Sequence, residues 1–134
     1  MIKKITTKFD ASILVVEDYS LNAEVVKEML EMMGCSVDIA ENGKVALDLL
    51  QNYDYDLIFM DIQMPVTDGV AATQMIRDMK SEKKDIPIIA LTANAFPGDR
   101  EKYLASGMNG FISKPLRAQD LEAILLKYLP KKED

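Results

Sequence analysis

Apolar and polar positions along the chain alternate in blocks that predict repeated strand–helix units. Short runs rich in apolar and β-branched residues are typical of strands, and those without polar alternation fit strands that are buried on both faces of a parallel sheet. Apolar residues at helical spacing follow each run and predict amphipathic helices. The predicted strands are Ile13–Val16, Cys35–Ala40, Leu57–Met60, Pro87–Leu91 and Gly110–Ser113. The predicted helices cover residues 21–33, 43–50, 72–79, 97–105 and 121–129.

Five such repeats of about two dozen residues predict an α/β fold with a doubly wound, five-stranded parallel sheet and five helices, because each crossover must return right-handed and cover one face. We expect the flavodoxin-like strand order 2-1-3-4-5, in which the first and third strands are neighbours. The fourth helix has a weak apolar stripe, mainly Tyr103 and Leu104, and should be loosely held.

The length of 134 residues fits one domain, which we expect to cover residues 11–130. Residues 1–10 are predicted to be a lead-in or linker, and residues 131–134 a charged tail. Neither a secretory signal nor a membrane span is predicted, since the amino-terminal segment has no long apolar core. We therefore expect no direct membrane insertion. We also expect the isolated domain to be monomeric.

Composition excludes several classes of function. Lys and Arg number 16 against 22 Asp and Glu, and the resulting net charge of −6 disfavours direct binding to nucleic acid. The chain has no histidine, so it cannot use Ser/His/Asp or Cys/His catalysis or a His-based zinc site. Its single cysteine, Cys35, is predicted to be a buried apolar filler, in keeping with a reducing compartment.

Polar side chains follow the predicted strands at the edge where α/β sheets bind ligands. Glu17 and Asp18 follow the first strand, Asp61 the third, Thr92 the fourth and Lys114 the fifth. Three converging carboxylates without Cys or His favour Mg²⁺, or Mn²⁺, as the cation that neutralises them. With Thr92 and Lys114 as donors, Asp61 is placed to act as a nucleophile toward a phosphoryl group.

Taken singly, each of these residues has an ordinary structural explanation. Asp61 alone could cap a helix, and the pair Glu17-Asp18 could lie in the first turn of a helix, where the helix dipole favours negative charge. Thr92 could bond to the backbone, and Lys114 could be a surface charge. Phe111 could equally be a packed core aromatic or an aromatic that changes position in a conformational switch. Their convergence is what supports a functional site.

Five short motifs occur together in one order and spacing. They are Val15-Val16-Glu17-Asp18, Met60-Asp61-Ile62-Gln63-Met64-Pro65, Asp68-Gly69, Leu91-Thr92-Ala93-Asn94 and Phe111-Ile112-Ser113-Lys114-Pro115. From about Ser12 to Leu129 the chain resembles the response-regulator receiver domains of two-component signalling, most of all those of hybrid sensor histidine kinases.

The resemblance implies a role for each matching residue. Asp61 is the expected phosphoacceptor, and Thr92 and Lys114 are expected to contact the phosphoryl group. Glu17, where many receivers have aspartate, joins Asp18, Asp61 and the Gln63 carbonyl as metal ligands, and Phe111 is the switch aromatic. It also implies a cis Lys114-Pro115 bond, against about 5–6% for X-Pro bonds generally.

The predicted function is therefore a cytoplasmic receiver in a phosphorelay, either free or as the cytoplasmic part of a membrane-bound hybrid kinase. A histidine kinase or histidine phosphotransfer domain would supply the phosphoryl group, and the receiver would catalyse its own phosphorylation and dephosphorylation without being a stand-alone metabolic enzyme. The main alternative is a non-phosphorylated interaction module of the same fold. An aspartyl-nucleophile phosphatase fits poorly, since its nucleophile normally lies in an Asp-x-Asp pair after the first strand.

Overall fold

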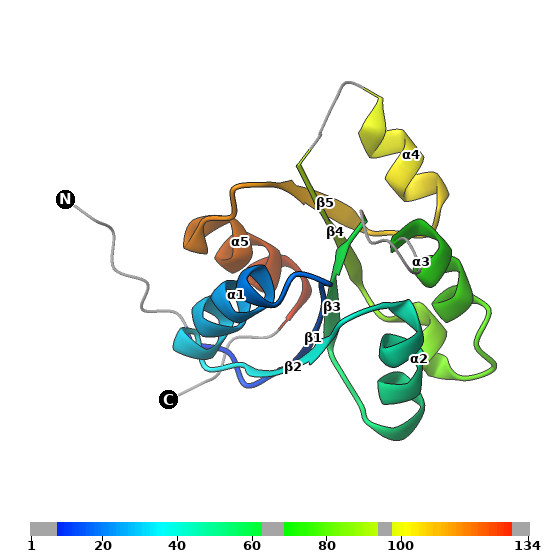
Figure 1. Cartoon of the computed structure of the whole chain (residues 1–134), viewed down its shortest axis with the longest axis horizontal. Coiled ribbons are helices and arrows are strands. Elements are labelled where there is room, and N and C mark those ends of the chain that lie inside the picture. The colour runs from blue at the N-terminus through cyan, green and yellow to red at the C-terminus, as the bar shows by residue number, and fades with distance from the viewer. Residues whose placement is uncertain (1–7, 63–68, 94–97, 130–134) are drawn as a thin grey trace.

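A parallel sheet of five strands forms the centre of the protein in the computed structural model, which describes residues 8–62, 69–93 and 98–129 (Figure 1). The strand order is β2-β1-β3-β4-β5, which confirms the predicted topology. The strands are β1 (Ser12–Val16), β2 (Ser36–Ala40), β3 (Leu57–Asp61), β4 (Ile88–Thr92) and β5 (Gly110–Ser113). The helices are α1 (Ser20–Met32), α2 (Gly43–Asn52), α3 (Gly69–Arg77), the short 3₁₀ helix η1 (Glu82–Asp85), α4 (Asp99–Ala105) and α5 (Ala118–Tyr128).

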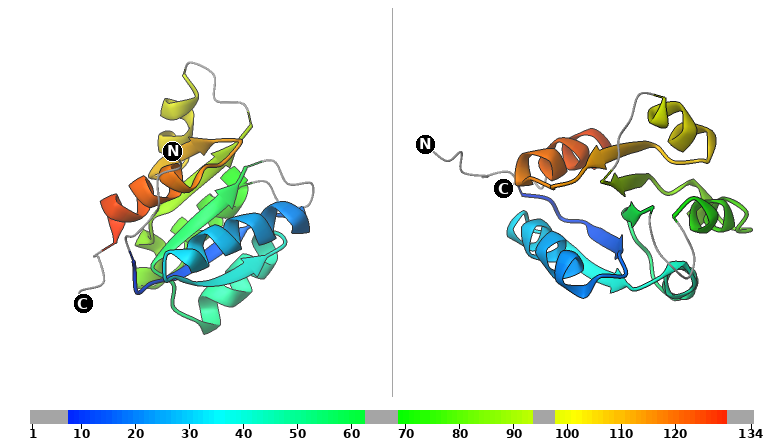
Figure 2. Two further views of the ribbon diagram at one scale, coloured as in Figure 1. Left: turned by 90° about the vertical axis from the view of Figure 1, so that its left-hand side faces the viewer. Right: turned by 45° about the horizontal axis from the view of Figure 1, so that its top comes forward.

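Helices cover both faces of the sheet, as the two turned views make clear (Figure 2). Helices α1 and α5 lie on one face, and α2, α3 and α4 lie on the other (Figure 1). All five residues of β3 and of β4 are buried, as expected for central strands with helices on either side. Each face therefore has its own apolar core, with Phe59 and Leu125 in the first and Met60 and Ile76 in the second.

The strand register brings distant parts of the sequence to one edge of the sheet. Val16 at the end of β1 pairs with Met60, the residue before Asp61. Asp61 in turn pairs with Leu91, the residue before Thr92. Since all strands are parallel, the residues that end or follow them lie together at the carboxyl edge.

Helix α3 begins earlier than its apolar pattern predicts, at Gly69 instead of residue 72. A Cβ added at Gly69 would lie 2.6 Å from the backbone oxygen of Asp61 and 2.7 Å from the Cα of Ile62. Only glycine fits so close an approach of helix to strand. The apolar spacing could not reveal this start, because glycine has no side chain to enter the pattern.

Helix α4 is shorter than predicted, beginning at Asp99 after Gly98, which has a φ of 92°. That left-handed conformation suits glycine and is not helical, so the helix starts at the next residue. Pro97, the predicted first residue of this helix, lies outside the described residues.

Phe9 is fully buried and belongs to the core beneath α1 and α5. Its backbone N–H donates to the carbonyl oxygen of Met33 at 2.7 Å. Gly34, with a φ of 92°, makes room for it, since a Cβ there would lie 2.7 Å from the Phe9 oxygen. Packing against the core therefore includes a residue of the segment that was predicted to be a lead-in.

Cys35 is buried, as predicted, and burial followed by the nearby charge of Asp56 raises the pKa of its thiol to about 11. Such a thiol is unreactive at neutral pH. Across residues 8–62, 69–93 and 98–129, none of the helices combines the length and the apolar character that crossing a membrane requires.

Candidate functional site

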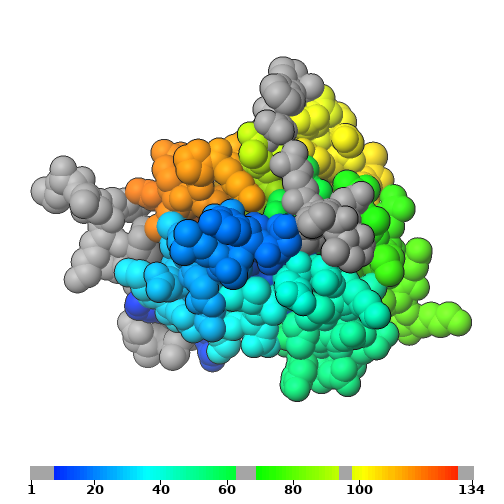
Figure 3. Space-filling model, viewed as in Figure 1, coloured from blue at the N-terminus to red at the C-terminus, as the bar shows by residue number. Residues whose placement is uncertain are grey.

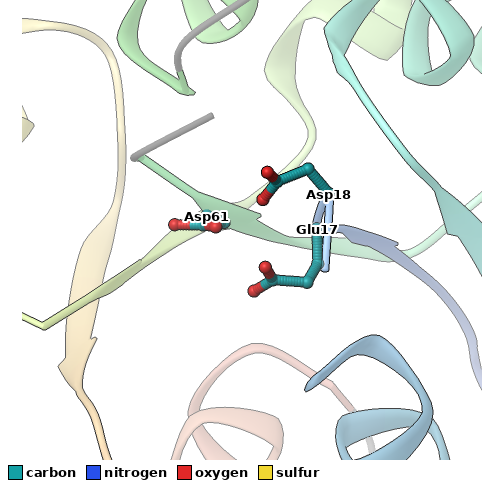
Figure 4. Close-up of side chains that lie close together, drawn as sticks. All are labelled: Glu17, Asp18 and Asp61. Carbon is teal, nitrogen blue, oxygen red and sulfur yellow. The ribbon is translucent and has the colours of Figure 1, made fainter. Parts of the chain in front are cut away.

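Three carboxylates converge at the carboxyl edge of the sheet (Figure 4). Glu17 and Asp18 directly follow β1, and Asp61 is the last residue of β3. One oxygen from each lies within 4.8 Å of the other two, a spacing at which all three could bind one ion. The register of β1 against β3 explains this proximity, since Glu17 follows the residue that pairs with Met60.

Two of these carboxylates are buried, which makes the cluster electrostatically costly. Glu17 is 3% exposed and Asp61 is 4% exposed, whereas Asp18 is open to solvent. Burial first, and then the hydrogen bond and the negative charge of Asp61, raise the pKa of Glu17 to about 7. The arrangement thus favours binding either a proton or a cation.

Lys114 supplies a positive charge to the same cluster. Its Nζ lies 3.3 Å from Oε2 of Glu17 and 3.8 Å from Oδ1 of Asp61. Its backbone N–H donates to the carbonyl oxygen of Thr92 at 2.7 Å, which fixes the segment after β5 beside the end of β4. The peptide bond between Lys114 and Pro115 is cis, as predicted.

Thr92 and the two aromatic residues Tyr103 and Phe111 form a second group beside the carboxylates. Thr92 ends β4 and is 1% exposed. The Tyr103 hydroxyl donates to its Oγ1 at 3.3 Å. The Tyr103 and Phe111 rings are tilted by 59°, with centroids 5.8 Å apart, and Phe111 is only partly buried.

The sequence predicted most of the residues of this site but not the role of Tyr103. Glu17, Asp18, Asp61 and Lys114 converge as expected. In the sequence, Tyr103 was identified only as an apolar position of the fourth helix. The hydroxyl of a tyrosine at such a position usually finds a hydrogen-bond partner when the ring is buried, and this property could have singled it out. Gln63, the predicted carbonyl ligand, lies outside the described residues.

The donor set fits a hard divalent cation. Among the described residues it offers the carboxylate oxygens of Glu17, Asp18 and Asp61, and Mg²⁺ prefers such oxygen ligands together with water. The exposed Asp18 leaves one side of the cluster open to solvent, where a second reactant can approach.

A groove borders the carboxylates between α1 and the segment after β5. It has a volume of about 270 Å³ and is lined by Glu17, Asn22, Val25, Val26, Lys114, Pro115 and Leu116. Leu21, one helical turn before Val25 in α1, is 62% exposed, a large fraction for a leucine in a folded domain. In the space-filling view α1 (blue) lies between the start of α5 (orange) and α2 (Figure 3).

The family model for the response regulator receiver domain matches residues 13–126. The chain belongs to this family. The predicted resemblance to this family is thereby confirmed.

Among curated proteins, this receiver is 43% identical over 130 residues to hybrid signal transduction histidine kinase G of Dictyostelium discoideum. The match covers 96% of this chain but 4% of that kinase. The chain spans 20% of transcription factor SKN7 of Saccharomyces cerevisiae, to which it is 38% identical over 125 residues. The likeness to receivers of hybrid kinases is therefore a likeness to one part of a much larger protein.

Two solved structures extend the comparison. The receiver domain of sensor histidine kinase PA1611 from Pseudomonas aeruginosa PAO1, with magnesium coordinated in its active-site cleft, is 40% identical, with a TM-score of 0.80 over 89% of this chain and 97% of that one. A chain from the co-crystal of the Saccharomyces cerevisiae phosphotransfer protein Ypd1 with the receiver domain of Ssk1 is 29% identical, with a TM-score of 0.80 over 93% of this chain and 91% of that one.

Proposed function

We propose that this receiver accepts a phosphoryl group onto Asp61 from a phosphohistidine on a partner protein. The observation that carries the proposal is the cluster of Glu17, Asp18 and Asp61 with Lys114 at its side. A charged site of this kind is expensive to keep in a folded protein, and an incoming cation and phosphoryl group would neutralise it. The partner must supply the histidine, since this chain has none.

In the transfer, a carboxylate oxygen of Asp61 attacks the phosphorus atom. The new O–P bond forms as the P–N bond breaks, and the histidine nitrogen leaves with the electron pair. Lys114 lies where its ammonium can neutralise a phosphoryl oxygen on Asp61, because its Nζ is already 3.8 Å from Oδ1. The Thr92 hydroxyl, at the end of the neighbouring strand, is the second proposed donor to the phosphoryl group.

Glu17, Asp18 and Asp61, with the Gln63 carbonyl, are the proposed ligands of Mg²⁺ or Mn²⁺. When bound, such an ion supplies charge neutralisation for the acidic residues and for the phosphoryl oxygens. The related receiver with magnesium in its cleft supports this assignment.

The direct test is labelling with a small phosphodonor. We expect the wild-type chain, incubated with acetyl phosphate and Mg²⁺, to gain the mass of one phosphoryl group, and Asp61→Asn to gain none, because an amide is a poor nucleophile. Asp48→Asn is the matched control, since Asp48 is an exposed helical aspartate of α2. Equal labelling of Asp61→Asn and wild type would refute the assignment and favour a non-phosphorylated interaction module.

The proposed partner is a histidine kinase or histidine phosphotransfer domain that docks against α1. The groove beside α1 opens onto Glu17 and Lys114. Leu21, one helical turn before the lining residue Val25, adds exposed apolar surface to the same helix. Docking here would bring a phosphohistidine to Asp61, and the likeness to a receiver crystallised with a phosphotransfer protein supports it. A cytoplasmic setting fits the free, buried thiol of Cys35.

Phosphotransfer kinetics test this surface. Leu21→Ala and Asn22→Ala should each slow transfer from a phosphorylated histidine phosphotransfer protein by about fivefold or more, as for residues central to an interface. Labelling by acetyl phosphate should stay unchanged. Met32→Ala is the control, because Met32 is 73% exposed at the far end of the same helix. Transfer that is insensitive to Leu21 and Asn22 excludes the α1 surface.

Phosphorylation is proposed to shift a conformational equilibrium. Thr92 would turn toward the phosphoryl group and Phe111 would move inward behind it, altering the face formed by α4, β5 and α5. NMR chemical shifts on adding beryllofluoride and Mg²⁺ should therefore change along α4 and β5. Changes confined to the residues around Asp61 would contradict the shift.

A further inference from the structure

Tyr103 links α4 to the functional site through one side chain. Within the described helix α4, Asp99–Ala105, only Tyr103 is buried, at 3% exposed. Its ring belongs to the core on that face of the sheet and packs against Phe111. The residue that anchors the helix is thus also the residue that reaches Thr92.

The hydrogen bond makes the positions of Tyr103 and Thr92 interdependent. The Tyr103 hydroxyl donates to Oγ1 of Thr92 at 3.3 Å, and both side chains are buried. A buried hydroxyl that loses its partner is costly unless it finds another acceptor or reaches water. If Thr92 turns away, the Tyr103 hydroxyl must therefore find another partner, or the ring must shift to reach one.

Of the paired rings Tyr103 and Phe111, only Tyr103 can bond to the threonine, because phenylalanine carries no hydroxyl. The Phe111 ring contacts Tyr103 at a tilted angle and can follow its movement by packing alone. The side chain that bonds to Thr92 is therefore Tyr103 on α4, and β5 supplies the apolar ring of Phe111 next to it.

We propose that Tyr103 is a positioning residue that holds the Thr92 hydroxyl in its resting place and so restrains phosphorylation of Asp61. This inference rests on the proposed function, since it concerns the turn of Thr92 toward a phosphoryl group. When Thr92 turns, the bond to Tyr103 breaks and α4 loses the fixed position of its one buried anchor. The state of Asp61 is thereby transmitted to α4.

The test compares Tyr103→Phe with wild type in a titration with beryllofluoride, a tetrahedral phosphoryl mimic, at saturating Mg²⁺. The variant removes the hydroxyl and keeps the ring. Losing one resting-state hydrogen bond should make beryllofluoride bind about two- to tenfold more tightly. Tyr128→Phe is the matched control, because the Tyr128 hydroxyl also donates at 3.3 Å, to the Asn109 carbonyl, and its ring packs against the core on the opposite face of the sheet from Tyr103.

Three further readouts separate restraint from simple structural support. Amide hydrogen exchange along α4 should rise in Tyr103→Phe without beryllofluoride, and not in Tyr128→Phe. Affinity for Mg²⁺ alone should stay unchanged. In a Thr92→Val background, adding Tyr103→Phe should have no further effect on beryllofluoride binding, since the acceptor is already gone.

Unchanged or weaker beryllofluoride binding by Tyr103→Phe overturns the inference, and an effect that persists in the Thr92→Val background does so too. Failure of the wild-type chain to bind beryllofluoride at all would instead overturn the proposed function, and the inference with it. The two failures are therefore distinguishable in a single titration series.

Discussion

At the scale of single residues, Glu17 illustrates the electrostatic cost of placing carboxylates in a buried site. Its carboxylate is almost wholly buried, within bonding distance of Lys114 and close to the carboxylate of Asp61. Burial, followed by the Asp61 hydrogen bond and charge, raises its pKa from an ordinary value of 4.5 to about 7, although Lys114 acts in the opposite direction. The ion pair therefore offsets only part of the cost.

This shift predicts that stability depends on pH in the absence of divalent ions. Because the pKa of Glu17 is higher in the folded chain, its contribution to stability is fully present below about 4.5 and is lost as the pH rises to about 7. The free energy of unfolding, measured by urea titration in chelator, should fall across that range. Glu17→Gln should flatten this part of the profile, and Glu24→Gln, on the exposed surface of α1, should not. A profile unaffected by Glu17→Gln would contradict the shift.

At the scale of secondary-structure elements, the junction between β3 and α3 sets the position of Asp61. Gly69 starts the helix against the backbone of Asp61 and Ile62, and its N–H donates to the Ile62 oxygen at 3.4 Å. The Thr73 hydroxyl donates to the Gly69 carbonyl at 2.7 Å, one turn into the helix. The first turn of α3 therefore lies directly against the end of the strand that carries Asp61, the proposed phosphoacceptor.

Gly69→Ala should lower the free energy of unfolding by about 1–3 kcal/mol, because the added methyl group meets backbone atoms that cannot yield easily. It should also slow acetyl phosphate labelling, since the shift needed to relieve the contact moves Asp61. Gly110→Ala is the matched control, with its nearest neighbour, Cδ1 of Ile89, at an ordinary 3.7 Å. The expectation fails if the two variants have the same stability and the same labelling rate.

Arg77, at the opposite end of α3, bonds to two connecting segments, one before β4 and one before β5. Its guanidinium donates to the carbonyls of Ile86 and Gly107 and to the side chain of Asn109. Asn109 also accepts from the N–H of Ile88 at the start of β4. These bonds tie α3 to the segments that flank β4 and β5 and so fix the amino ends of both strands.

At the scale of the whole molecule, the aromatic side chain of Phe9 closes one core beneath α1 and α5. Phe9→Ala should reduce the free energy of unfolding by about 3–5 kcal/mol, the usual cost of removing a fully buried phenylalanine. Tyr53→Ala, at a residue 60% exposed, is the comparison for truncating an aromatic ring. Urea unfolding of both variants measures the difference, and similar losses would show that Phe9 is not part of the core in solution.

The sequence predicted the fold and most of the site because both depend on repeated local signals. The central strands β1, β3 and β4 are apolar runs, with Glu17, Asp61 and Thr92 at their ends, and Lys114 follows the short strand β5, so a parallel topology was enough to bring these residues to one edge. The cis Lys114-Pro115 bond came from family resemblance alone.

The remaining features depend on single contacts that leave no periodic trace. Phe9 is an isolated aromatic between Lys8 and Asp10, and its burial depends on the space left by Gly34. The bond from Tyr103 to Thr92 depends on how α4 sits on the sheet, which its weak apolar stripe does not determine.

The burial of Phe9 also determines where other domains can be tethered. Phe9 lies beside Met33 at the end of α1, and the Tyr128 hydroxyl at the end of α5 bonds to Asn109, just before β5. Both ends of the described fold are thus at the amino edge of the sheet, away from Asp61. A donor domain fused to either end must first span a five-residue strand, roughly 17 Å, which is about the mean reach of a flexible linker of ten residues. Linker length would therefore control the effective concentration of an attached phosphohistidine, and with it the balance between transfer within one molecule and transfer between two.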